Sequence, residues 1–91
     1  MEPLHTTAAQ ALRVLLDAQP TTAAKVAFVW TMAAGPALAR ATETEWRDDG
    51  VLIVRARTDA WRRELRRARP VLTARVKEMS GAGVVKQIVI E

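Results

Sequence analysis

The chain has 91 residues, 49% of them hydrophobic, and its 14 basic and 10 acidic residues give a net charge of +4. This length and apolar content predict one folded domain with a small core, and they argue against a disordered chain. The absence of cysteine excludes disulfides, thiol nucleophiles and cysteine–zinc sites, and no apolar run approaches the roughly 20 residues that span a bilayer.

The N-terminal residues predict a tail and then a helix. No basic segment followed by an apolar stretch opens the chain, so we expect no signal peptide, a cytoplasmic location and no membrane partner. Residues 1–7 are expected to form the tail, and residues 8–91 a single domain. A first helix is predicted over about residues 8–18, with Thr7 as N-cap and Pro20 as the stop. Its apolar face consists of Ala9, Leu12, Leu15 and Leu16.

A second helix is predicted to begin after Thr21 or Thr22. It should end at Gly35-Pro36, because proline lacks the N–H that would continue a helix. Its apolar residues at helical spacing are Ala23, Val26, Ala27, Trp30 and Ala34. Trp30 is therefore expected in the core.

After a further helical turn expected over residues 38–41, the pattern changes to the alternation of β-strands. Residues 42–47 alternate, and a run rich in β-branched residues follows over residues 51–57. The Asp-Asp-Gly sequence between these segments predicts a hairpin turn. A last alternating strand is predicted over residues 84–90.

The segment over residues 61–79 predicts a helix with two faces, because its apolar residues recur at spacings of three or four. The apolar stripe consists of Trp61, Leu65, Ala68, Leu72, Val76 and Met79. The opposite half of the helix carries Arg62, Arg63, Arg66, Arg67, Arg69 and Lys77. Asp59, after Thr58, is expected to cap this helix, and Pro70 is expected to cause a kink or to separate two stacked helices.

This order of elements predicts an α+β fold with a three-stranded sheet and helices packed on one face. If the second and third strands are parallel, the long helix between them should form a right-handed crossover.

No residue pattern predicts catalysis, a metal site, a cofactor or a small-molecule substrate. His5 is the only histidine and lies in the expected tail, and Asp48 and Asp49 fit the turn. The Ser-Gly-Ala-Gly sequence over residues 80–83 lacks the lysine and the following helix of a phosphate loop. Trp46 is compatible with packing beneath a helix or with stacking on a base, and the sequence leaves both open.

The arginine-rich face predicts an anionic partner, because the guanidinium fork binds phosphate oxygens in bidentate fashion. Glu64 is the only acid along the helix before Glu78, so most of the arginines lack a partner there. Glu43 and Glu45 on the first strand either repel nucleic acid or solvate that face. The predicted nucleic-acid-binding residues are Arg55, Arg57, Arg62, Arg63, Arg66, Arg67, Arg69 and Lys77. A solvated or protein-binding face is the alternative.

Several short sequences, in order and spacing over about residues 23–90, resemble the DciA family. They are Val29-Trp30, Ala34-Gly35-Pro36, Leu38-Ala39, Gly50-Val51-Leu52-Ile53-Val54, Asp59-Ala60-Trp61, Glu64-Leu65, Leu72, Val84-Val85 and Ile88. The resemblance implies a KH-like domain with a role in bacterial DNA replication, in which family members assist loading of the DnaB-type replicative helicase and bind DNA.

Together these observations predict a non-enzymatic nucleic-acid-binding domain that assists helicase loading and binds single- or double-stranded DNA with weak sequence preference. A protein-interaction adaptor without direct DNA binding and a KH-like RNA-binding module remain as alternatives.

Overall fold

The computed structural model describes residues 11, 21–81 and 83–91. The helix predicted over residues 8–18 lies outside the described residues apart from Ala11, and so does the tail before it. The described elements are α2 (Ala23–Ala34), α3 (Pro36–Arg40), β1 (Thr42–Trp46), β2 (Val51–Ala56), α4 (Asp59–Ser80) and β3 (Gln87–Ile90). The predicted α+β class and the predicted order of these elements are confirmed.

The three strands form one mixed sheet in the order β1-β2-β3, with β1 antiparallel and β3 parallel to β2. The predicted hairpin is confirmed, since Gly50 adopts a φ of 91° and its N–H bonds the Arg47 carbonyl at 3.0 Å. β3 begins at Gln87 rather than at Val84, because the N–H groups of Lys86 and Gln87 both turn toward the Gly50 carbonyl.

Both long helices begin at a threonine cap. Thr22 is the cap of α2, since its hydroxyl accepts a bond from the Lys25 N–H at 3.1 Å. The prediction that Asp59 caps α4 is wrong. The cap is Thr58, whose extended backbone lets its hydroxyl accept from the Trp61 N–H at 3.1 Å, and Asp59 is the first helical residue.

Pro70 does not divide α4, which runs as a single helix of 22 residues. Proline has no N–H to donate, so the Arg66 carbonyl loses its usual partner within the helix. Both residues are exposed, and water can hydrate the carbonyl at this position. The alternative of two stacked helices is therefore wrong.

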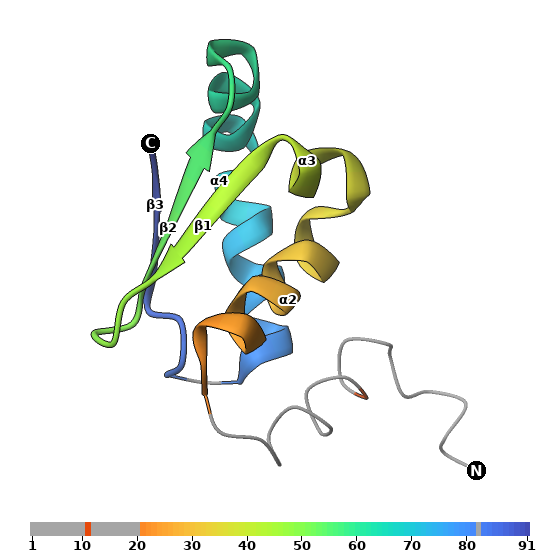
Figure 1. Cartoon of the computed structure of the whole chain (residues 1–91). Coiled ribbons are helices and arrows are strands. Elements are labelled where there is room, and N and C mark those ends of the chain that lie inside the picture. Colours follow the sequence, from red (N-terminus) through yellow and green to blue (C-terminus); the bar gives the residue numbers. More distant parts are fainter. Residues whose placement is uncertain (1–10, 12–20, 82) are drawn as a thin grey trace, which may run out of the picture.

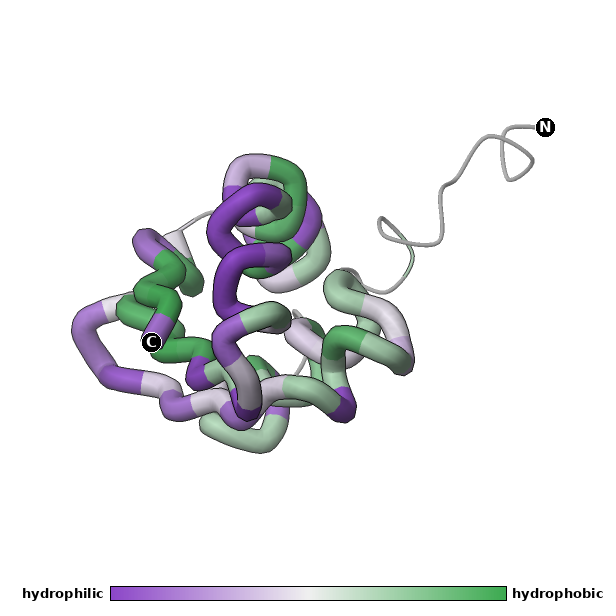
Figure 2. The backbone as a smooth tube through the Cα atoms, turned by 90° about the horizontal axis from the view of Figure 1, so that it is seen from above, coloured by the Kyte–Doolittle hydropathy of each residue, from purple (hydrophilic) through white to green (hydrophobic). Residues whose placement is uncertain are grey.

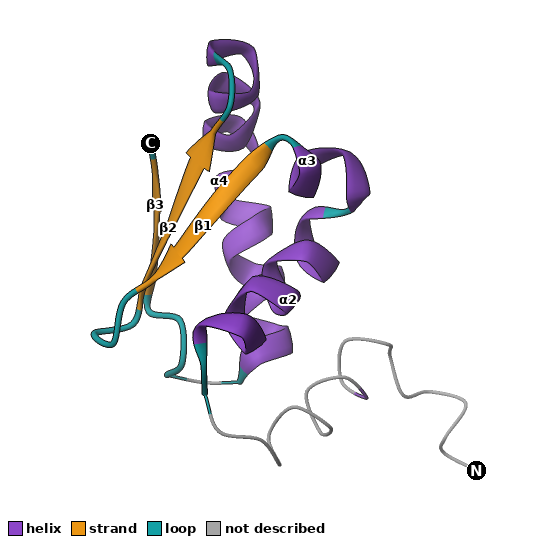
Figure 3. Cartoon of the chain, in the orientation of Figure 1, coloured by secondary structure: helices purple, strands orange, loops and turns teal. Residues whose placement is uncertain are grey.

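Helices α2 and α4 cover one face of the sheet (Figure 1; Figure 3). The core between them consists of Val26, Val29, Trp30, Ala33, Leu52, Val54, Leu65, Leu72, Val76, Val85 and Ile88. Trp30 is buried as predicted, and its indole N–H donates to the Thr42 hydroxyl at 3.0 Å. Trp46 is partly buried and packs against this core. This contact favours packing beneath a helix over stacking on a base, the two roles that the sequence left open.

Trp61 is half-buried and lies outside the core cluster, so its predicted core role is wrong. The first turns of α4 project beyond the end of the sheet (Figure 1). No strand lies beneath them, and the buried positions of α4 begin only at Leu65. The apolar stripe is buried from Leu65 onward, but its first member, Trp61, has no core to enter.

Candidate nucleic-acid interface

Helix α4 has two different flanks on either side of its buried stripe. On one flank, Arg75 donates to the Ala33 carbonyl of α2 at 3.3 Å. At about 100° per residue, most of the basic residues fall on the other flank. We call this second side the basic flank, and it consists of Arg62, Arg63, Arg66, Arg69 and Lys77. Viewed from above, hydrophilic residues make up most of the tube over the first turns of α4, with single apolar residues between them (Figure 2).

Most cations on the basic flank have no carboxylate partner. Arg62 pairs with Asp59 within the first turn of α4. For the other members, Arg63, Arg66, Arg69 and Lys77, the described part of the chain provides no ion pair. Unpaired guanidinium groups keep their donors for an external anion. This flank is therefore the strongest candidate for an anion-binding surface.

Arg67 lies on the solvent-facing back of α4 and pairs with Glu64, with a distance of 2.5 Å between Nη2 and Oε2. The hydrogen bond and charge of Arg67 lower the pKa of the Glu64 carboxyl, and the same pair raises the pKa of Arg67. The two side chains are 75% and 44% exposed, so water and salt screen the pair. Such a pair is readily exchanged for a phosphate contact.

Arg55 and Arg57 lie on the open face of the sheet, where glutamates pair with both. Arg55 bonds Glu45 at 2.8 Å and Glu91 at 3.1 Å. Arg57 bonds Glu43 at 3.2 Å and the Arg40 carbonyl at 2.9 Å. Glu43 and Glu45, whose role the sequence left open, therefore neutralise the two strand arginines.

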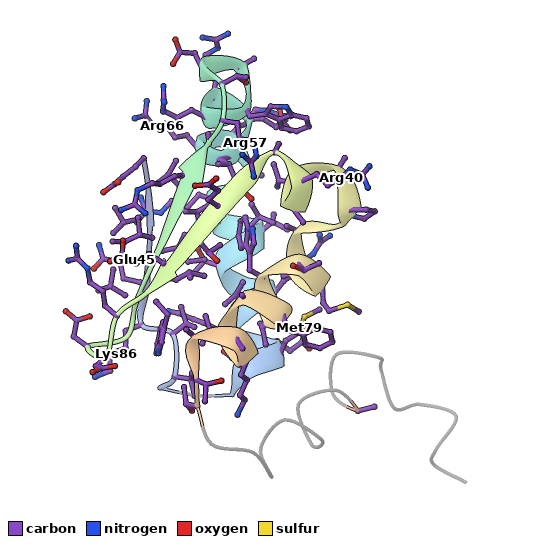
Figure 4. The ribbon with its side chains drawn as sticks, in the orientation of Figure 1. Arg40, Glu45, Arg57, Arg66, Met79 and Lys86 are labelled. Carbon is purple, nitrogen blue, oxygen red and sulfur yellow. The ribbon has the colours of Figure 1, made fainter. Side chains whose placement is uncertain are left out.

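The eight predicted residues thus divide between two places. Six belong to α4, whereas Arg55 and Arg57 belong to an ion-paired network on the sheet. Arg57 is at the end of the sheet from which α4 projects, and Arg66 lies above that end (Figure 4). Arg57 is accordingly the strand residue best placed to extend the basic flank.

The Arg55 network predicts a pH-dependent contribution to stability. The hydrogen bond from Arg55, reinforced by its charge, lowers the pKa of the Glu45 carboxyl from its ordinary value of 4.5. A depressed pKa in the folded state contributes stability above pH 4.5, and this contribution is lost as the pH falls through the lower, folded value. We expect Glu45→Gln to have a lower urea midpoint than the wild type at pH 7, with the difference shrinking as the pH falls below 4.5 and disappearing below the lower, folded pKa.

Glu78→Gln is the matched control, because Glu78 is exposed and forms no ion pair among the described residues. A pH-independent difference between Glu45→Gln and the wild type would show that the ion pair is not its cause.

A family model described as Dna[CI] antecedent, DciA, matches residues 4–90. The chain belongs to the DciA family. This confirms the resemblance predicted from the sequence, and membership implies a role in loading the DnaB-type helicase during DNA replication. A search of curated proteins gives no significant match.

Several features of this DciA-family domain bear on its chemistry. Among the described residues, no cluster of three or more histidine or acidic side chains is placed to bind a metal ion. No helix in the described ranges is long and apolar enough to cross a membrane. Many KH domains hold nucleic acid with a Gly-x-x-Gly loop between two helices. In this domain the corresponding residues, near Arg69 and Pro70, are interior to α4.

Proposed function

We propose that this DciA-family domain binds DNA through the basic flank of α4 as part of its role in helicase loading in the cytoplasm, and that it does so without catalysing a reaction. The observation that carries the proposal is that Arg63, Arg66, Arg69 and Lys77, on one side of one helix, have no ion pair among the residues that the structure describes. A face whose charges served only solubility would be expected to mix both signs.

The proposed mechanism is neutralisation of backbone phosphates. With a rise of about 1.5 Å per residue, the basic flank extends roughly 21 Å from Arg63 to Lys77, which is enough to follow several consecutive phosphates. Contacts to phosphates position a protein on DNA but carry little sequence information. Weak sequence preference therefore follows from this mode of binding.

The remaining predicted residues support this surface to different degrees. Arg62 and Arg67 have exposed partners on their own helix and can exchange them for phosphates. Arg55 must release two carboxylates and Arg57 one. We therefore expect the sheet arginines to contribute less to DNA affinity than the basic flank does.

A salt titration tests the proposal directly. With about four phosphates neutralised, the logarithm of the association constant should fall against the logarithm of salt concentration with a slope of about −3 to −4 for duplex DNA. Fluorescence anisotropy with labelled single- and double-stranded DNA of unrelated sequences measures both the slope and the sequence preference.

Absence of DNA binding at low salt, together with co-purification with the helicase, would contradict the proposal and favour the adaptor function. A marked preference for single-stranded RNA over DNA would instead favour the RNA-binding alternative.

A further inference from the structure

Trp61 is a large aromatic side chain that the core does not use. It is half-buried, yet it belongs neither to the core cluster nor to the partly buried residues that pack against that cluster. Its indole N–H donates to no residue within the described part of the chain, whereas the indole N–H of Trp30 is bonded to Thr42. A surface tryptophan with an unused donor is typical of a binding contact, because its rigid ring offers a large apolar face.

The backbone of Trp61 is held in the first turn of α4. Its N–H donates to the Thr58 hydroxyl at 3.1 Å, so the beginning of the helix is capped at this residue. The first turns of α4 project beyond the end of the sheet, and no strand lies beneath them (Figure 1). Trp61 is therefore carried by an ordered helix but lies outside the packed part of the domain.

Two arginines accompany Trp61 at this end of the molecule. Arg62 follows it on α4 and belongs to the basic flank, about 100° around the helix axis from Trp61. Arg57 precedes α4 by two residues and lies at the end of the sheet from which the helix projects (Figure 4). A DNA strand whose phosphates follow the basic flank toward the beginning of α4 therefore arrives beside the indole ring.

The exposed ring of Phe28 offers a comparison with Trp61. Phe28 is 47% exposed, but it lies on α2, whose only basic residue is the buried Lys25. Helix α2 contacts the flank of α4 that faces away from the basic flank, as the bond from Arg75 to Ala33 shows. A strand bound along the basic flank has no base near Phe28, which makes this residue a matched control.

We propose that Trp61 stacks on an unpaired base of a DNA strand whose phosphates contact the basic flank. This inference rests on the proposed DNA binding and adds a contact to a base. Stacking on an aromatic ring tolerates every base, because each base has a π face. The bases of a duplex are already stacked on one another, and extruding one of them costs free energy. Trp61 therefore favours single-stranded over double-stranded DNA without conferring a sequence preference.

An abasic oligonucleotide separates stacking from phosphate contacts. The probes are labelled single strands of about 12 nucleotides, one an oligothymidine and the other an oligonucleotide with the same sugars and phosphates but no bases. In the full chain, Trp61→Leu is expected to weaken binding of the oligothymidine by about fivefold or more, the loss that removal of one stacking contact causes. Its binding of the abasic strand and of duplex DNA should equal that of the wild type.

Two further variants serve as controls in the same titrations. Trp61→Phe keeps an aromatic face and should retain most of the affinity for the oligothymidine. Phe28→Leu removes an exposed ring that lies away from the basic flank, and it should bind both probes as the wild type does. Circular dichroism should show that all three variants fold.

The two probes also distinguish failure of this inference from failure of the proposed function. Equal affinity of the wild type for both probes, or an equal loss for both in Trp61→Leu, would overturn the stacking contact and leave phosphate binding in place. If the wild type bound neither probe nor duplex DNA at low salt, the proposed DNA binding itself would be contradicted, and the stacking contact with it.

Discussion

Replacing Arg63 and Arg66 with glutamate is expected to weaken DNA binding about a hundredfold or more. Each charge-assisted hydrogen bond to a phosphate contributes about 1.5 kcal/mol or more, and each introduced carboxylate adds repulsion. The slope of the salt dependence should become shallower by about two units, because two phosphate contacts are lost. Anisotropy titrations at several salt concentrations measure both quantities.

The matched control for this variant is Arg40→Glu with Lys86→Glu, which changes the net charge by the same amount. Arg40 lies on α3 and Lys86 at the end of the sheet remote from Arg66 (Figure 4). If phosphates contact the basic flank, the control should retain most of its affinity and its salt slope. Equal losses in the two double variants would show that overall charge, and not this surface, determines binding.

The fold should survive the charge reversal. Both arginines are exposed and neither has a carboxylate partner within the described residues. A glutamate at position 66 lies at helical spacing from Arg62 and Arg69, and one at position 63 lies four residues before Arg67, so each can pair with an arginine of the same helix. An unchanged unfolding midpoint, measured by circular dichroism, would separate a loss of binding from a loss of structure.

Trp30→Ala is expected to destabilise the domain by about 3–5 kcal/mol, a large part of the stability of a domain this small. Trp30 is 2% exposed, and its truncation would leave a cavity between α2 and the sheet. It would also remove the hydrogen bond to Thr42, whose hydroxyl in turn lies 3.0 Å from the Leu38 carbonyl. Urea unfolding monitored by circular dichroism measures the change in the free energy of unfolding.

Two further variants separate the contributions to that loss. Trp30→Phe retains an aromatic ring but removes the indole donor. It should therefore lose part of the free energy of unfolding that Trp30→Ala loses. Trp61→Ala removes the same side chain from a half-buried position outside the core and should cost well below the loss for Trp30→Ala. Equal losses of unfolding free energy in Trp30→Ala and Trp61→Ala would contradict the placement of Trp61 outside the core.

Local patterns in the sequence were enough to predict most of the elements. The spacing of Leu65, Leu72 and Val76 predicted the buried stripe of α4, and these residues are buried. Gly35-Pro36 and the Asp-Gly turn predicted where α2 and β1 end. Each of these features depends on backbone geometry within a few residues, so no knowledge of distant contacts was needed.

The pairing of the strand arginines depended on the sheet and could not be predicted from spacing alone. Arg55 is directly opposite Glu43 in the register of β1 and β2, yet it bonds Glu45, its diagonal neighbour. Its second partner, Glu91, follows β3 and is 36 residues away in the sequence. Antiparallel and parallel pairing together bring these carboxylates to one guanidinium group, which restricts its availability to an external phosphate.

The sequence by itself determined the order of the elements, the buried stripe of α4 and the family, because all three are encoded in local spacing. Only the tertiary structure decided which residues on α4 reach the core and which arginines are unpaired. Trp61 is outside the core because α4 begins beyond the end of the sheet. Arg63, Arg66 and Arg69 have no ion pair within the described residues, whereas the glutamates on β1 and after β3 pair with Arg55 and Arg57 on the open face of the sheet.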